Sequence, residues 1–211
     1  MRLRPLFASV LAACMVSACA DFHSKQAAIQ VYTLEPSFAA SASVPAPASV
    51  PAPAPGTARA AATLLLPRPL AAPGLDTEGI ALQRNGQRLD YYAASRWAAP
   101  LPEIVQSQAI AALRAAGKFR SVQPDGAAFA AELVLQLEIH RCQAEYSADG
   151  PPTVHVQLLA TLGRRADRSV LATVSAAGAA QAAENRMESV VAAFQSALGA
   201  ALGELSTELA P

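Results

Sequence analysis

Residues 133–140 read Leu-Val-Leu-Gln-Leu-Glu-Ile-His, with leucine or isoleucine at every second position. Successive side chains of a β-strand point to opposite faces, so this spacing places the four large aliphatic side chains on one face. The opposite face carries Val134, Gln136, Glu138 and His140, three of which are polar. The stretch therefore predicts a strand with one face in a core and the other toward solvent.

The same two-residue period returns twice further along the chain. The aliphatic positions are Val154, Val156, Leu158, Ala160 and Leu162 in one stretch, and Val170, Ala172, Val174 and Ala176 in the next. Three half-buried strands in succession predict an antiparallel meander with one apolar face.

A helical stripe follows the meander. Its apolar residues recur at helical spacing and are Met187, Val190, Val191, Phe194, Ala197, Leu198, Ala201, Leu202, Leu205 and Leu209. Such a stripe could bind an acyl chain or a partner helix. We favour the simpler interpretation, in which this helix covers the apolar face of the meander.

Upstream, residues 79–93 form an alternating stretch centred on Asn85-Gly86. Asn-Gly suits the two left-handed positions of a type I′ turn, so the stretch predicts a β-hairpin with a two-residue turn. The predicted pairs are Arg84 with Gln87, Leu82 with Leu89, and Ile80 with Tyr91.

Residues 101–116 have helical apolar spacing, with Pro102 and Glu103 in the first turn and Gly117 after the last. Shorter apolar runs at 29–34, 63–66 and 119–123 predict additional strands. Together these elements predict one α+β domain, in which two main helices pack on a mixed, largely antiparallel sheet.

The N-terminus has the features of a secretion signal. Arg2 and Arg4 precede an apolar run from residue 6 to 16, which is shorter than the roughly 20 residues of a membrane-spanning helix. The following Val16-Ser17-Ala18-Cys19 resembles the lipobox of bacterial lipoproteins, which implies cleavage before Cys19 and acylation of its thiol. Leu11-Ala12-Ala13-Cys14 is an alternative lipobox, but it leaves a very short apolar core.

We expect residues 1–18 to be a lipoprotein signal peptide and residues 19–35 to hold the anchor, a short tether and the first strand. Residue 20 is alanine rather than the aspartate of inner-membrane retention, so by analogy the anchor goes to the outer membrane. Residues 36–60 are Ala/Pro-rich and cannot join a sheet. They are either a tether or, if residues 29–34 pair into the sheet, a loop of the 61–211 domain.

Composition limits the class of function. The chain has 211 residues, and without residues 1–18 it carries 14 basic and 16 acidic residues. Nucleic-acid binding normally requires a clustered basic face, so no nucleic-acid partner is expected. If Cys19 is acylated, Cys142 is the remaining thiol and no internal disulfide can form.

Signatures of catalysis are scarce, and we expect no enzyme, no catalytic residue and no cofactor. Gly117-Lys118 resembles the end of a phosphate loop, but Phe119 stands where Ser or Thr is needed. His140 and His155 would lie opposite each other across a hairpin centred near Ser147, close to Glu138. They could ligate a metal, but a third ligand at tight spacing is missing, so we predict no metal site.

Tyr91, Tyr92, Arg96 and Trp97 form the densest aromatic cluster in a chain that is 5% aromatic. They could contact lipid or a partner protein. Aromatic residues at a strand-to-helix corner more often pack inside. We therefore expect Tyr91 and Trp97 to wedge the following helix onto the sheet, with Tyr92 on the other face.

Several stretches in a fixed order carry a family resemblance. They are Tyr32-Thr33-Leu34, residues 72–76, residues 89–97 (Leu-Asp-Tyr-Tyr-Ala-Ala-Ser-Arg-Trp), Pro100 with the helix to Gly117-Lys118-Phe119, the strand at 133–139, and Ala193-Phe194. This set resembles the ABC-type transport auxiliary lipoproteins, the outer-membrane partners of mammalian-cell-entry (MCE) lipid transport systems, including the paraquat-inducible one.

The resemblance implies a non-enzymatic lipoprotein on the periplasmic face of the outer membrane, anchored through Cys19. Its implied partners are an MCE-domain protein and the ABC transporter that energises it. A phospholipid, a sterol-like lipid and further copies of the chain are additional candidate partners. The resemblance also favours pairing of the Tyr32 strand into the sheet. An outer-membrane assembly factor or structural envelope lipoprotein without a transport partner is the alternative.

Overall fold

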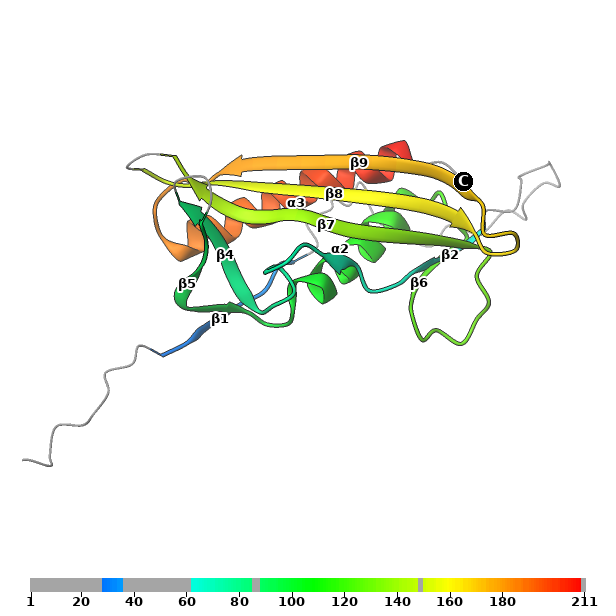
Figure 1. The fold of residues 1–211 in the computed structure, drawn as a ribbon, viewed down its shortest axis with the longest axis horizontal. Coiled ribbons are helices and arrows are strands. Elements are labelled where there is room, and N and C mark those ends of the chain that lie inside the picture. Colours follow the sequence, from blue (N-terminus) through cyan, green and yellow to red (C-terminus); the bar gives the residue numbers. More distant parts are fainter. Residues whose placement is uncertain (1–27, 36–61, 85–87, 148–149, 210–211) are drawn as a thin grey trace, which may run out of the picture.

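The computed structural model describes residues 28–35, 62–84, 88–147 and 150–209. Within these residues, one nine-stranded sheet carries two helices on one side, so the predicted α+β fold with a mixed sheet is confirmed (Figure 1). The strands are β1 (Gln30–Tyr32), β2 (Thr63–Leu66), β3 (Leu70–Ala71), β4 (Gly79–Arg84), β5 (Arg88–Trp97), β6 (Ser121–Pro124), β7 (Leu133–Tyr146), β8 (Thr153–Arg164) and β9 (Val170–Gln181), and the helices are α2 (Leu101–Ala116) and α3 (Met187–Glu208).

The three long strands β7, β8 and β9 form the predicted antiparallel meander. Leu137 pairs with Ala160, and Leu158 pairs with Ala176, so the small and large aliphatic residues of neighbouring strands share one face. Leu137, Leu158, Ala160 and Ala176 are all essentially buried. Period-two alternation therefore predicted the buried face of this half of the sheet correctly except at Val170, which is 66% exposed because the β8–β9 register shifts between Leu162 and Gly163.

The other edge of β7 is shared among three short strands. β2, β3 and β4 pair with it in parallel, one after another along its length. β6 extends the sheet beyond β2, while β5 and then β1 extend it beyond β4. The antiparallel pairings are the longest, but the parallel ones bring the N-terminal and C-terminal halves of the chain into one sheet.

The predicted register of the β4–β5 hairpin is wrong by one residue. Arg84 pairs with Arg88, and Leu82 pairs with Asp90, so three residues rather than two separate the strand ends. The Asn-Gly pair itself lies outside the described residues. A one-residue offset moves side chains to the opposite face of a strand, so Leu89 and Tyr91 point away from the face on which Leu82 is buried.

α2 begins and ends as predicted, with Pro102 in the first turn and Gly117 after the last. Gly117 has φ 65°, the left-handed conformation that glycine adopts at helix ends without steric cost. α3 packs on β8 and β9, which confirms that the last helix covers the meander. Within the described residues, neither helix combines the length and apolarity needed to cross a membrane.

α3 comes exceptionally close to the sheet at Gly178. A Cβ atom built on Gly178 would lie 2.0 Å from the carbonyl oxygen of Ala197 in α3. Nearby, Phe194 of α3 meets the ring of Trp97 edge-on, with 5.2 Å between ring centroids. Because both aromatic side chains are completely buried, this contact joins α3 to the corner between β5 and α2.

β1 and the residues after it are held by both helices. β1 pairs in parallel with β5, and the Gln108 side chain of α2 donates a 2.6 Å hydrogen bond to the carbonyl of Leu34. Gln195 of α3 donates to the carbonyl of Glu35. The strand before the Ala/Pro-rich segment, β1, and the strand after it, β2, therefore belong to the same sheet. The segment itself lies outside the described residues.

Candidate functional site

The predicted lipid-anchor residue Cys19 and its alternative Cys14 lie outside the described residues. Cys142, on β7, is described and buried. Desolvation raises the pKa of its thiol to about 12, so the reactive thiolate is scarce at neutral pH. Cys142 therefore contributes to packing and lacks the accessible thiolate of a reactive cysteine.

The two strand histidines are not opposite each other. His155 pairs with Gln143, because the hairpin between β7 and β8 turns later than the predicted Ser147 centre, and His140 sits in a β-bulge. His140 Nε2 lies 3.2 Å from a Glu138 oxygen, and His155 Nε2 lies 3.8 Å from a Glu145 oxygen. Among the described residues, no group of three or more potential ligands could hold a metal ion.

The aromatic cluster divides between the core and the surface. Trp97 is buried as expected, but its ring meets Phe194 of α3, whereas the expected contact was the following helix, α2. Tyr91 is 44% exposed and does not wedge α2, so that part of the prediction is wrong. Its hydroxyl donates a 2.7 Å hydrogen bond to the carbonyl of Gly74. The ring lies against Gly79, where a built Cβ would be 2.6 Å from it. Tyr91 thus covers a glycine of the neighbouring strand.

Tyr92 belongs to a polar network that the sequence pattern did not reveal. Its hydroxyl lies 3.0 Å from that of Tyr146, which donates a 2.9 Å hydrogen bond to Asn185. The guanidinium of Arg84 lies 4.9 Å from the centre of the Tyr146 ring. Burial and the bond to Tyr146 raise the pKa of Tyr92. The network joins β4, β5, β7 and the segment that precedes α3.

Lys118, which had resembled a phosphate-loop lysine, has a structural role. Its ammonium group donates hydrogen bonds to the carbonyls of Thr207 and Leu209, at 2.6 and 3.1 Å. These carbonyls belong to the C-terminal end of α3, where a positive charge is favourable. Lys118 therefore ties the end of α2 to the end of α3.

One face of the long strands is left uncovered by the two helices, which both lie on the opposite side of the sheet (Figure 1). The outward side chains of β7, β8 and β9 are small or polar along most of their length. In register across the strands they include Glu138, Leu159 and Ser175, then Gln136, Thr161 and Thr173. We call this surface the open face.

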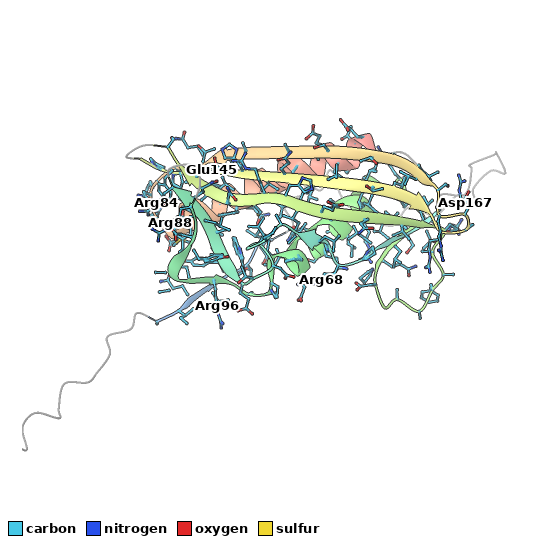
Figure 2. All side chains as sticks on the ribbon, in the orientation of Figure 1. Arg68, Arg84, Arg88, Arg96, Glu145 and Asp167 are labelled. Atoms are coloured by element: carbon cyan, nitrogen blue, oxygen red, sulfur yellow. The ribbon has the colours of Figure 1, made fainter. Side chains whose placement is uncertain are left out.

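A basic turn, residues 164–169, closes one end of the open face between β8 and β9. Arg88 and Asp167 lie at opposite ends of the sheet, with Asp167 in this turn (Figure 2). The Asp167 carboxylate accepts hydrogen bonds from the hydroxyl and the backbone N–H of Ser169, at 2.7 and 3.1 Å, and from Arg164 at 3.2 Å. These bonds lower the pKa of Asp167 to about 2 and hold the turn in shape.

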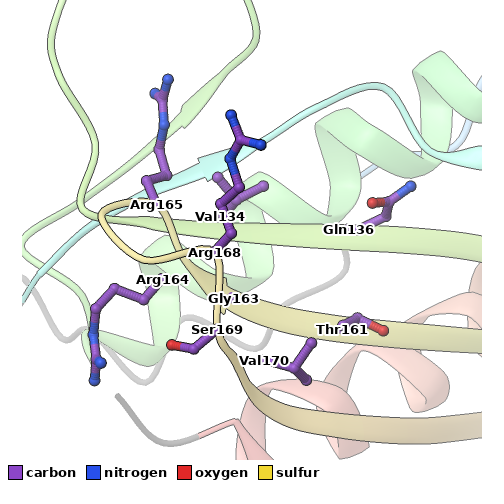
Figure 3. A pocket seen from close by; sticks show the side chains of 9 residues that line it. All are labelled: Val134, Gln136, Thr161, Gly163, Arg164, Arg165, Arg168, Ser169 and Val170. Carbon is purple, nitrogen blue, oxygen red and sulfur yellow. The ribbon is translucent and has the colours of Figure 1, made fainter.

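The other two arginines of the basic turn have no side-chain partner among the described residues. Figure 3 shows the side chains of Arg165 and Arg168 extending in the same direction, while Arg164 points the other way. They border a cavity of about 490 Å³ whose floor is formed by Val134, Thr161, Gly163 and Val170. The sequence analysis did not identify this cluster, although the loop between two alternating strands contains three arginines.

The comparisons with known proteins agree with this architecture. A model of a family described as ABC-type transport auxiliary lipoprotein component matches residues 43–208. The structure of protein XCC0632 from Xanthomonas campestris, of family DUF330, is 21% identical with a TM-score of 0.67, covering 84% of this chain and 92% of that one.

Two further solved structures are more distant. An uncharacterized protein is 12% identical with a TM-score of 0.56, covering 70% of this chain and 91% of that one. A PelC dodecamer from Paraburkholderia phytofirmans is 17% identical with a TM-score of 0.41, covering 70% and 90%. No curated protein is significantly similar in sequence.

Proposed function

Because the chain belongs to the family of ABC-type transport auxiliary lipoprotein components, we propose that it serves an ABC-type MCE lipid transport system as a non-enzymatic docking component. In this proposal residues 1–18 are removed as a signal peptide and Cys19 is acylated. The acyl chains hold the protein in the outer membrane, with its domain on the periplasmic face. The single observation that supports the proposal most is the family match over residues 43–208.

The open face is the surface we assign to docking. α3 packs against one side of the long strands, and the outward side chains on the other side are small or polar along most of their length. Interfaces of nonobligate partners resemble the rest of a protein surface in polarity, so such a face suits a partner that binds and leaves. Ser175 lies midway along β9, beside Leu159 of β8, and is exposed.

The attachment of β1 also fits an anchored protein. Only eight residues lie between Cys19 and Ala28, so the two are nine residue steps apart and at most about 30 Å when the chain is fully extended. β1 is paired with β5, and Leu34 is bonded to Gln108 directly after it. A lipid anchor at Cys19 would therefore hold the sheet close to the membrane surface.

The test is to recover partners from native membranes. A C-terminally tagged chain is crosslinked briefly, extracted in mild detergent, and its partners are identified by mass spectrometry. We expect an MCE-domain protein together with an ABC permease and ATPase, and their loss in a Cys14→Ser/Cys19→Ser control. Recovery of outer-membrane assembly proteins alone, or of nothing above that control, would reject the transport role.

A pair of matched variants tests the open face itself. Ser175→Arg places a large charged side chain on the open face, whereas Ser196→Arg places one on the exposed side of α3. We expect Ser175→Arg to reduce the crosslinked partner at least about tenfold, since one misplaced charge can cost more than 1.4 kcal/mol at an interface. An equal effect of Ser196→Arg would argue against the open face.

A further inference from the structure

The basic turn carries three arginines and one aspartate, so its positive charge is neutralised only in part. Two carboxylates lie close to it, Asp167 within the turn and Glu132, whose carbonyl accepts a 3.0 Å hydrogen bond from the backbone N–H of Arg165. Asp167 is bonded to Ser169 and Arg164. The Glu132 carboxylate accepts a 2.6 Å hydrogen bond from the backbone N–H of Thr63 and pairs with Arg120 at 3.5 Å. Asp167 therefore neutralises Arg164 within the turn, Glu132 is engaged by Thr63 and Arg120, and neither carboxylate pairs with Arg165 or Arg168.

Arg165 and Arg168 consequently present two guanidinium groups to one side of the cavity, as Figure 3 shows. Arg168 is held there by an unusual backbone, with φ 57°. A non-glycine residue rarely adopts this conformation. Arginine binds phosphate oxygens with two parallel hydrogen bonds, so a pair of guanidiniums at a cavity edge suits a phosphate group.

The floor of the cavity is uncharged and mixed, with Thr161 beside the apolar Val134 and Val170, and it is hollow at Gly163. Gly163 lies between Val134 and Val170 in the register of the three strands, and it has no side chain to fill the space between them. A Cβ built on Gly163 would have its closest contact, 3.4 Å, with the carbonyl of Ser169. This distance is an ordinary contact, so packing does not require glycine here.

Apolar side chains are exposed around the same end of the sheet. Val170 and Leu171 at the start of β9 are 66% and 40% exposed, and Phe129 in the loop before β7 is 80% exposed. That loop leads into Glu132, which is bonded to Arg165, so the loop and the basic turn share one end of the domain (Figure 1). Phosphate-binding groups beside exposed hydrocarbon are complementary to an amphiphile rather than to a free anion.

We propose that the cavity beside the basic turn binds the phosphate headgroup of an anionic phospholipid. Arg165 and Arg168 hold the phosphate, while Val134 and Val170 contact the first carbons of the lipid. Phe129 contacts the part of the lipid hydrocarbon that lies farther from the phosphate. The biological meaning of this site rests on the proposed function in lipid transport, but the binding can be measured without any transport partner.

The test measures binding by calorimetry with the full-length chain in dodecyl maltoside. The probes are dihexanoylphosphatidylglycerol, dihexanoylphosphatidylcholine and inorganic phosphate. We expect the anionic lipid to bind more tightly than the other two, and its affinity to fall as salt is added. Inorganic phosphate binding as tightly as the anionic lipid would overturn the lipid assignment.

Three variants locate the site. Arg165→Gln/Arg168→Gln removes both guanidiniums, and Gly163→Val fills the floor; we expect each to weaken binding of the anionic lipid about tenfold or more. Arg88→Gln/Arg186→Gln removes the same charge elsewhere on the exposed surface and should change the affinity less than about twofold. Trp97 fluorescence verifies that each variant is folded.

Unchanged affinity in the Arg165→Gln/Arg168→Gln variant would overturn the proposal, as would an equal loss in the control variant. Loss of a crosslinked protein partner in this variant, with lipid affinity unchanged, would assign the surface to an acidic protein instead. Lipid binding that follows the expected pattern without recovery of any transport partner would support the site while rejecting the proposed function. The two conclusions can therefore fail separately.

Discussion

Replacement of Gly178 by alanine should destabilise the protein, although the same replacement in an ordinary strand would stabilise it. Glycine in a strand interior normally costs roughly 0.5–1 kcal/mol relative to alanine, because it loses more backbone freedom on folding. At Gly178 a Cβ would lie 2.0 Å from the carbonyl oxygen of Ala197, 2.9 Å from its carbon and 3.0 Å from the nitrogen of Ala201. The sign of the effect therefore depends on the fold.

The magnitude follows from what must move. All three contacted atoms belong to the backbone of α3, so no side-chain rotation relieves the overlap. Restoring a contact of about 3.5 Å displaces the helix by roughly 1.5 Å from the sheet. Leu198 and Leu202 are buried in the same interface and would lose close contact with it. Overpacking of this kind costs about 1–3 kcal/mol.

The assay is unfolding of the full-length chain, followed by fluorescence of Trp97, its single tryptophan. Trp97 is buried against Phe194 of α3, so its emission reports on the displaced helix directly. We expect a loss of about 2 kcal/mol for Gly178→Ala. For a chain of this size that loss lowers Tm by about 4–8 °C.

Gly199→Ala is the matched control, because a Cβ on this α3 glycine meets nothing within 4 Å. It should stabilise the helix by up to about 1 kcal/mol, the propensity difference between glycine and alanine. A Gly178→Ala protein as stable as the wild type, or stabilised like the control, would refute the close approach of α3 to β9.

Three further outcomes are expected. Gln108→Ala leaves the buried carbonyl of Leu34 without its donor and should cost about 1–3 kcal/mol in denaturant unfolding; an unchanged midpoint would show that the bond is dispensable. In an NMR titration, the chemical shift of the Ser169 amide should change with a midpoint near pH 2. The pKa of Asp167 is lowered from 3.8 to about 2, so its hydrogen bonds are fully formed above pH 3.8 and are lost only as the pH falls through about 2. A midpoint near pH 4 would show that these bonds do not form. Cys142 should resist alkylation at pH 8 in the native protein, because burial raises the pKa of its thiol to about 12. It should react after denaturation, as measured by peptide mass spectrometry. Rapid labelling of the native protein would contradict this burial.

Local pattern was enough to predict several elements of this protein. Pro102 and Gly117 determined the ends of α2, because proline is accepted only in the first helical turn and glycine adopts the left-handed conformation at the end without steric cost. Alternation around Leu137 and Leu158 identified the buried face of the meander. These predictions succeeded because period and backbone preference are properties of neighbouring residues.

The surface features were predicted less well. Tyr91 was assigned to the core by its neighbours in sequence, but the hairpin register turns it outward. His140 and His155 were brought together by an assumed turn that the chain makes later. Each error comes from a wrongly predicted register between two paired strands. A shift of one or a few residues changes which side chains meet across the strands but leaves the apolar pattern within each strand intact.

The sequence by itself therefore determined the two main helices, the three long strands and most of the apolar face of those strands. Only the tertiary structure decided that β2, β3 and β4 share one edge of β7 in parallel, and that Gly178 lies under α3. It also decided that Arg165 and Arg168 border a cavity with Val134, about thirty residues earlier in the chain. Parallel pairing and close packing join residues that are distant in sequence. Which strand or helix lies beside which depends on the shape of the whole core rather than on any local preference.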